Sequence, residues 1–452
     1  MKEIKVTFQT LTPLWTGDAW RRSDDLKLTG IIGSLRWWFE ALVRGMGYKA
    51  CDSTGDNSCK VEVKNPEDVL EIHKEICPVC YLFGTTGWKS RFSVEIEENN
   101  LSKPYNEKVV IRIDGNRGWH YEPGLMGNAV LKIRFNEAFL KKEDKEIRLT
   151  EVAPSILKIL LYLIQEYGML GAKTAMGYGV VKFRINEKEL TISEDDWNNF
   201  VNYLDFFSKF RGNIIHLPNL KDMFFVNFNV IKPIDEIINK IKTFYSYQDG
   251  AIETDEITKW KDKGWCITSP VMRKCLRCIF RGKYSNQVCW INRDCDRNYW
   301  WNYYGENNSK NKANRSYNSN LTIDRLNVNY DIAKKIRHFL MGSTSEPEFS
   351  AIQVSHMNKK DQDNFEFRVY GWLPNIPPID GRVNDIIALL NTLFMNVPWR
   401  KRFGRENGRN QEIDLLPSSI QNNLCWNGNS IRKIGDENRI RQLFNVQEDL
   451  GL

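Results

Sequence analysis

A glycine-rich segment, Gly168–Gly179 (GMLGAKTAMGYG), separates a helix-like run, Pro154–Tyr167, from a strand-like run, Tyr178–Arg184. Four glycines in this segment allow positive φ angles and the close approach of other backbone. Lys173 and Thr174 put a cation and a hydroxyl near the loop tip, so we predict that the loop approaches an anion. The spacing is not that of a P-loop, because a strand and not a helix follows the lysine. A tight turn with incidental glycines is the alternative.

The runs of the first half follow a ferredoxin-like order. Without a cysteine-bearing insertion (residues 45–90) and an extra hairpin, the order is β-α-β-β-α-β. The expected elements are strands Ile4–Thr10, Phe92–Ile96, Val109–Ile113, Ala129–Phe135 and Tyr178–Arg184, with helices Ile31–Arg44 and Pro154–Tyr167. A linking helix, Glu194–Phe210, closes this domain, residues 1–210.

The second half, residues 211–452, repeats most of that order after a long insertion at about residues 235–320. The expected elements are strand Met223–Ile231, helix Tyr330–Leu340, strands Ala351–Met357 and Phe365–Leu373, and helix Val383–Phe394. The sequence therefore predicts an α+β fold of two tandem ferredoxin-like (RRM-like, βαββαβ) domains with long insertions.

The basic residues are concentrated in one part of the chain. The formal net charge is +7, and Val271–Tyr317 alone holds ten Lys and Arg against three acidic residues. A second basic run is Arg400–Arg405. Such surfaces favour polyanions, although a solvated face is the alternative. No apolar run reaches the ~18 residues of a membrane span and the N-terminus lacks a signal-peptide core, so we expect a cytoplasmic protein without a membrane partner.

The run Thr29–Arg44 is an amphipathic helix with an exposed start. Ile31, Leu35, Trp38 and Leu42 form its apolar stripe. Small residues in its first turn leave backbone N–H groups open at the positive end of the helix, which suits a phosphate.

Several motifs occur together in a characteristic order. They are Leu11–Asp18 (LTPLWTGD), the helix from Thr29, Ile76–Trp88 (ICPVCYLFGTTGW), the glycine loop, Phe349–His356 (FSAIQVSH) and Arg368–Pro374 (RVYGWLP). In these motifs the sequence resembles the RAMP superfamily of CRISPR-associated proteins. More narrowly, it is similar to the first-numbered subunits of Cmr (type III-B) RNA-targeting effector complexes.

This resemblance implies an RNA-binding subunit in antiviral defence, without nuclease activity. Its partners would be crRNA, target RNA and other RAMP subunits of a Cmr complex, near the end remote from the crRNA 5′ tag. The aromatic signature of RNA-recognition motifs is not evident, so loops and helix starts are the expected contacts. The candidate RNA-binding residues are Arg21, Arg22, Arg36, Gly171, Lys173, Thr174 and Gly177.

Two groups of cysteines have spacings that suit zinc. Cys77 and Cys80 form a CxxC knuckle, and Cys51 and Cys59 could complete four thiolates, with His73 as a possible substitute for one cysteine. Free buried cysteines are the alternative. A second possible structural zinc site comprises Cys275, Cys278, Cys289 and Cys295.

Catalytic patterns are weak. The histidines show no HxH or HExxH spacing, and Asp24 and Asp25 fit charge pairing with Arg21 and Arg22 better than a metal site. Because some RAMP relatives process crRNA with a histidine base, an endoribonuclease using His120 is the second interpretation. A stand-alone zinc-dependent RNA-binding protein is the third.

Overall fold

The structure is a computed structural model. It describes residues 2–55, 58–62, 68–111, 119–142, 145–230, 245–247, 254–270, 323–342, 350–360, 364–396, 405–406, 409–410 and 433–444, with positions 235, 238, 273, 276, 277 and 280. The predicted zinc ligands Cys275, Cys278, Cys289 and Cys295 lie outside this part, as do most of the basic segment Val271–Tyr317 and Arg400–Gly404 of the second basic run.

The first half of the chain contains an antiparallel sheet. Its strands are β1 (Lys2–Thr10), β2 (Phe92–Ser102), β5 (Met126–Phe135), β8 (Val181–Ile185) and β9 (Lys188–Glu189). Their spatial order is β2-β5-β1-β8-β9, and each neighbouring pair is antiparallel. With a helix after β1 and another after β5, strands β1, β2, β5 and β8 have the predicted βαββαβ connection.

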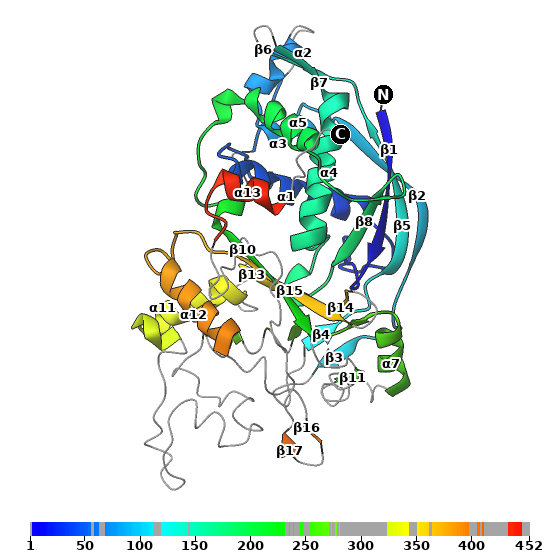
Figure 1. The fold of residues 1–452 in the computed structure, drawn as a ribbon, viewed down its shortest axis with the longest axis vertical. Helices are drawn as coiled ribbons and strands as arrows, with labels where there is room; N and C mark the ends of the chain where they lie inside the picture. The colour runs from blue at the N-terminus through cyan, green and yellow to red at the C-terminus, as the bar shows by residue number, and fades with distance from the viewer. Residues whose placement is uncertain are drawn as a thin grey trace, which may run out of the picture.

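Helices α1 (Leu28–Gly45) and α4 (Leu149–Tyr167) pack on one face of this sheet, and α5 (Glu194–Asp205) packs against α4 (Figure 1). Alternation in β1 explains the arrangement, because Ile4, Val6 and Phe8 are buried toward the helices while Lys5 and Gln9 are exposed. The apolar stripe of α1 is buried as predicted.

Helix α4 begins five residues earlier than the sequence suggested. Pro154 was expected at its first position, but the helix runs from Leu149 and contains Pro154 in its second turn. Leu149 and Val152 are buried, so core packing extends the helix across the proline despite the lost backbone donor.

The second half contains another antiparallel sheet, of β10 (Met223–Val230), β12 (Trp265–Cys266), β13 (Ile352–Val354), β14 (Met357–Lys359) and β15 (Phe365–Trp372). The order is β10-β15-β14-β12, and β13 also pairs with β15. Helix α11 (Tyr330–Met341) precedes β13, and α12 (Val383–Asn396) follows β15. Where a fourth ferredoxin strand would lie, Ile434 N donates to Met223 O at 2.9 Å. The tandem arrangement itself stays a prediction.

The two halves share an extensive interface. Trp38 of α1 lies against Phe225 and Tyr370 of the second sheet, with ring centroids 6.4 and 5.5 Å apart. Arg368 donates to Gln165 O and Gly168 O at the end of α4. Val109–Ile111 (β3), expected inside the first domain, pairs instead with Tyr245–Tyr247 (β11) and Trp119–Tyr121 (β4). These contacts join residues that are far apart in the sequence, so no local sequence pattern predicts them.

The remaining elements are short. They are α2 (Asp68–Glu71), η1 (Ile72–Lys74), α3 (Pro78–Phe83), β6 (Phe139–Lys142), β7 (Lys145–Arg148), η2 (Thr174–Met176), η3 (Ser208–Phe210), η4 (Leu220–Asp222), α7 (Thr254–Asp262), η8 (Ile323–Leu326), β16 (Arg405–Glu406), β17 (Arg409–Asn410) and α13 (Glu437–Leu443). Helix α13 returns to the first half, beside α1 (Figure 1). Among the described helices, none has the length and apolarity that crossing a membrane requires.

Candidate metal centre and nucleic-acid interface

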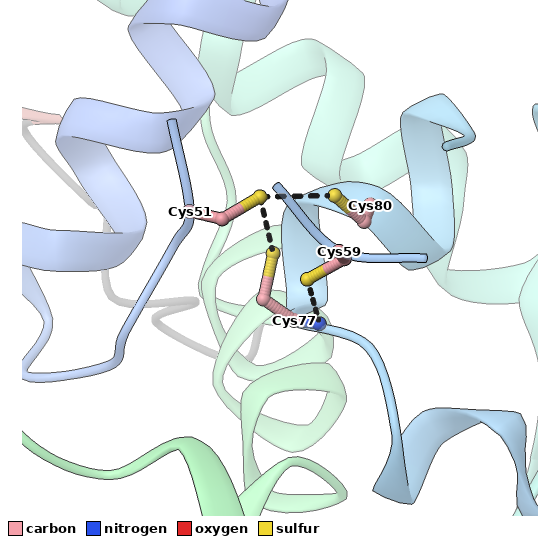
Figure 2. Close-up of side chains that lie close together, drawn as sticks. All are labelled: Cys51, Cys59, Cys77 and Cys80. Carbon is pink, nitrogen blue, oxygen red and sulfur yellow. Dashed lines mark hydrogen bonds between the residues drawn. The ribbon is translucent and has the colours of Figure 1, made fainter. Parts of the chain in front are cut away.

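Cys51, Cys59, Cys77 and Cys80 converge on one point between α1 and α3 (Figure 2). Their sulfur atoms all lie within 4.8 Å of one another. The Cys51 Sγ is 3.3 Å from the Cys80 Sγ and 3.9 Å from the Cys77 Sγ, so all four are free thiols and no disulfide joins them.

These distances fit a tetrahedral zinc ion. With Zn–S bonds of about 2.3 Å, tetrahedral geometry puts the sulfurs about 3.8 Å apart. The two sulfur separations of 3.3 and 3.9 Å lie on both sides of that value, and Cys77 and Cys80 are buried where water cannot solvate a thiolate. The donor set therefore fits structural zinc, which would be held by the four thiolates and would tie the loop after α1 to α3.

Local structure explains why the thiols meet. Cys77 is the N-cap of α3 and Pro78 follows at the first helical position, where a proline costs no hydrogen bond. Cys80 is then the third residue of the helix, within its first turn. Cys59 is held beside them because its Sγ accepts the Cys77 backbone N–H at 3.5 Å and Thr85 donates to its carbonyl.

Two arginines of α1 contact residues of the cluster. Arg36 Nη2 donates to the Cys80 Sγ at 3.1 Å, and Arg44 Nη2 donates to the Cys51 carbonyl at 2.9 Å. Glu40 lies between them and accepts from both, at 3.1 and 3.2 Å. Four thiolates with one zinc ion carry a net charge of −2, which two arginines help to offset.

The thiols perturb one another's protonation. Hydrogen bonds from Cys59, Cys77 and Cys80 hold the pKa of Cys51 below its usual range. The pKa values of the other three are raised, because hydrogen bonding to Cys51 and burial both favour their neutral forms. One thiolate is thus stabilised in advance, and a dication would stabilise the rest.

His73 is not a member of this group. It is buried against Phe206 and Phe207, with ring centroids 6.5 and 6.3 Å away. The sulfur cluster is therefore complete with its four cysteines, and His73 contributes to packing.

The glycine loop has a structural role that the sequence did not reveal. Gly177 has φ +98°, and a Cβ there would lie 2.6 Å from Ser269 Cβ and 2.7 Å from His356 Nδ1. Gly171 has φ +84°, and a Cβ there would meet Trp15 O at 2.5 Å. Both glycines thus face the protein's own atoms, and Thr174 Oγ1 donates to Gln353 Oε1 across the interface.

Lys173 is half-buried in that loop. Its Nζ lies 3.1 Å from the centroid of the Trp15 ring, a cation–π contact. Burial lowers the pKa of this ammonium, and Glu122 partly opposes the shift. An RNA contact by Lys173 stays a prediction.

Arg21 and Arg22, two of the predicted RNA contacts, lie exposed in the loop before α1. Asp24 pairs with Lys103 at 2.6 Å and with Arg22 at 3.8 Å, while Asp25 pairs with Lys27 at 3.5 Å, so the expected local pairing is confirmed for Asp24 with Arg22. The predicted contact Arg36 differs, because its three side-chain nitrogens donate to Glu40, Gly84 O and Cys80.

The outer face of the first sheet is polar. A hollow of about 410 Å³ on it is lined by residues such as Thr7, Gln9, Asn128 and Lys182, with no aromatic side chain among them. This composition agrees with the expectation that bases do not stack on the sheet. His120, the alternative catalytic residue, lies exposed on β4 opposite Val110.

The chain is similar to one protein family and to several solved structures. Residues 7–182 match the model of the RAMP superfamily. No curated protein sequence matches the chain. Cmr1 from Pyrococcus furiosus (apo crystal structure) is 12% identical over 83% of this chain and 88% of its own, with a TM-score of 0.32. A chain of the type III-B Cmr-beta complex bound to cognate target RNA is 13% identical over 82% and 94%, with a TM-score of 0.33.

At such identities and TM-scores we draw no argument from the two structures. The match to the family model rests on sequence. It runs from β1 to the start of β8 and includes the cysteine cluster, the loop before α1 and the glycine loop. The similarity to the RAMP superfamily is therefore a property of residues 7–182.

Proposed function

We propose that this chain is a non-catalytic RNA-binding subunit of a type III-B CRISPR (Cmr) effector complex in antiviral defence. It would contact crRNA or target RNA near the end remote from the crRNA 5′ tag and would work in the cytoplasm. The observation that carries the proposal is the RAMP segment 7–182 together with the basic loop that it presents at Arg21 and Arg22. The motif order Ile76–Trp88, glycine loop and Phe349–His356 supports the narrower Cmr assignment.

Exposed arginines on an ordered loop suit phosphates. An arginine presents several N–H donors in a planar fork, and a phosphodiester offers matching oxygens. Each phosphate neutralised on a single strand adds about 0.7 to the salt slope of binding. The affinity should therefore fall steeply with salt.

The test is filter binding of the full chain to a labelled single-stranded RNA at several salt concentrations. The double variant Arg21→Glu, Arg22→Glu should bind about 10-fold or more weakly, since two favourable charges become repulsive. The control is Lys188→Glu, a charge reversal at an exposed residue on β9 of the first sheet. If both variants lose RNA affinity equally, net charge explains the loss and this loop is not part of the RNA site.

The alternative function, a crRNA-processing endoribonuclease with His120 as the base, has a separate test. The full chain should leave crRNA precursor intact with magnesium and with chelator. Cleavage that His120→Ala abolishes would overturn the non-catalytic role and establish the alternative.

We also propose structural zinc at Cys51, Cys59, Cys77 and Cys80. Metal analysis of purified protein should find at least one zinc per chain, and Cys77→Ser with Cys80→Ser should remove one equivalent. A second equivalent would be assigned to Cys275, Cys278, Cys289 and Cys295 by the same substitution test. Zinc content near zero would assign the cysteines to packing.

A further inference from the structure

Trp20 is the most exposed large apolar side chain among the described residues. It is 78% exposed, although tryptophan is among the costliest side chains to leave in water. Its loop is nevertheless well ordered. Asp18 Oδ1 accepts the backbone N–H groups of Trp20 and Arg22 at 2.9 and 2.8 Å, and Asp18 N donates to Arg22 O at 2.7 Å.

This order means that the indole is presented to solvent by a fixed turn. The neighbouring Arg21 has a positive φ of +61°, which is uncommon for a residue with a side chain. A turn built around one carboxylate therefore holds an aromatic ring and two guanidinium groups on the outside of the protein.

A hollow of about 430 Å³ lies beside this turn. Arg22, Lys103 and Lys108 line it, and Asp24 and Glu122 are its acidic residues. Its floor includes Trp15, over whose ring Lys173 is placed. Three cations from two separate segments thus line the hollow with two carboxylates, which leaves one excess positive charge.

The two carboxylates hold the lysines in position. Lys103 pairs with Asp24 at 2.6 Å, and Lys108 pairs with Glu122 at 3.2 Å. These pairs are substantially exposed, so they are weak and a phosphate oxygen can compete for the ammonium groups. A hollow of this size accommodates a ligand as large as a nucleotide.

We propose that Trp20 and this hollow bind one nucleotide of a single-stranded RNA segment. The base stacks on the Trp20 indole, and its phosphates contact Arg22, Lys103 and Lys108. This inference rests on the proposed RNA-binding function and names the residues and the strandedness of that site. Only an unpaired base offers its face to a protein side chain, which excludes the interior of a duplex.

The surroundings of Trp20 favour RNA over a protein partner. A protein hot spot is normally an aromatic side chain ringed by other contact residues that exclude water. Within the turn, the other exposed residues are Ala19, Arg21 and Arg22, so the turn itself presents one aromatic ring beside two guanidinium groups. Aromatic rings interspersed with basic residues are typical of single-strand binding.

The experiment compares Trp20→Ala, Trp20→Phe and wild-type full-length protein with a single-stranded RNA 12-mer, the same oligomer carrying abasic sites, and an RNA duplex. Trp20→Ala should lower the affinity for the intact single strand about 5- to 150-fold, the equivalent of ~1–3 kcal/mol for one stacked base. Trp20→Phe should keep most of the affinity. The abasic oligomer and the duplex should bind wild type and Trp20→Ala equally. Ile215→Ala, which removes another exposed apolar side chain, is the matched control.

A second part of the experiment tests the proposed phosphate contacts. Lys103→Gln and Lys108→Gln should each reduce the salt slope by about 0.7 on the single strand. If wild type binds the 12-mer and Trp20→Ala binds it equally well, the stacking site is wrong while the proposed function stands. If wild type binds no RNA, the proposed function itself fails. If Trp20→Ala keeps its RNA affinity but loses assembly with Cmr subunits, the surface is a protein contact and the inference is overturned.

Discussion

Arg36 shows how a residue that sequence reasoning assigns to a ligand can be used within the protein. It lies in the third turn of α1, where the sequence analysis placed it near an expected phosphate at the helix start. The structure turns it toward α3, where Nη2 donates to Cys80 at 3.1 Å and Nη1 to Gly84 O at 2.8 Å. An arginine with these contacts stabilises a thiolate and orients a metal ligand.

We therefore expect Arg36→Met to weaken zinc binding about 10-fold, because outer partners of a metal ligand typically contribute 10- to 100-fold. Competition with a chromogenic chelator measures this change directly. Arg22→Met, an exposed arginine of the same domain, is the control and should leave the chelator midpoint unchanged. Identical chelator midpoints for the two variants would show that Arg36 does not support zinc binding and would leave it as a candidate RNA contact.

Arg44 is unsuitable as a control for Arg36. It is buried and donates to Glu40, Ala50 O, Cys51 O and Pro218 O, so its reversal would disrupt folding. A neutral substitution at an exposed arginine such as Arg22 avoids this difficulty.

Gly177 is the position at which a single methyl group should matter most. Its φ is +98°, and a Cβ would lie within 3 Å of Ser269 and His356. Gly177→Ala should cost about 2–4 kcal/mol in the free energy of unfolding, from strain and overpacking together. Gly33→Ala is the control, because a Cβ at Gly33 on helix α1 meets nothing within 4 Å. That change should be neutral or stabilise by up to about 1 kcal/mol. Chemical denaturation of both variants would contradict the packing role if Gly177→Ala unfolds like wild type.

At the scale of elements, the N-terminus of α5 is fully capped. Ser193 and Asp196 form a capping box, in which each side chain accepts the other's backbone N–H, and Asp196 also accepts from Lys158 of α4. Burial alone would raise the pKa of Asp196, but Lys158 and the Ser193 donors outweigh it and hold the pKa below its ordinary value of 3.8.

Asp196→Ala should lower the free energy of unfolding at pH 7 by about 2 kcal/mol, the cost of a lost cap and a half-buried ion pair. The folded-state pKa is depressed, so this contribution is present above pH 3.8 and is lost as the pH falls through the folded-state value. Denaturation at pH 7 checks the size, and the difference from wild type should narrow below pH 3.8. Asp195→Ala, an exposed change in the same helical turn, should cost under about 1 kcal/mol. A cost as small for Asp196→Ala would contradict the cap.

Sequence periodicity was sufficient to locate most of these elements. Helices α1, α11 and α12 and strands β1, β10 and β15 lie within a few residues of their expected bounds, because each has a clear apolar pattern. It failed where tertiary packing decides the outcome, as at the start of α4 and in the pairing of β3 with β11.

The same distinction holds for the candidate sites. The CxxC knuckle identified Cys77 and Cys80, and the structure brings Cys51 and Cys59 to them. Trp20 was missed, since an isolated tryptophan beside two arginines is more often buried and only its exposure reveals it. The glycines of the loop were attributed to an anion, because a sequence cannot show which atoms face them.

At the scale of the whole molecule, His356 lies where the two halves meet. Its ring packs against Tyr121 and Tyr178 of the first half and Trp265 of the second, with centroids 5.5, 5.6 and 6.2 Å away. Its backbone N–H donates to Gly177 O at 3.1 Å, and its Nδ1 accepts the Ser269 N–H at 3.3 Å. Among the charged groups nearby, Arg273 is buried beside Tyr121. An imidazolium here would be desolvated, and it would lose the Nδ1 acceptor.

The interface should therefore weaken in mild acid. Burial lowers the pKa of His356 from 6.5 to about 3 in the folded protein. The unfolded chain takes up the proton first, so the contribution of His356 to stability is full above pH 6.5 and is lost as the pH falls from 6.5 toward 3. Over that window wild type should lose about 1.4 kcal/mol per pH unit more than His356→Gln, which has no titrating ring. Chemical denaturation of both proteins at pH 7.5, 6 and 5 measures the difference, in which the titration of all other groups cancels. Parallel pH profiles would mean that His356 reaches water in the native state and that the two halves are not sealed against each other at this point.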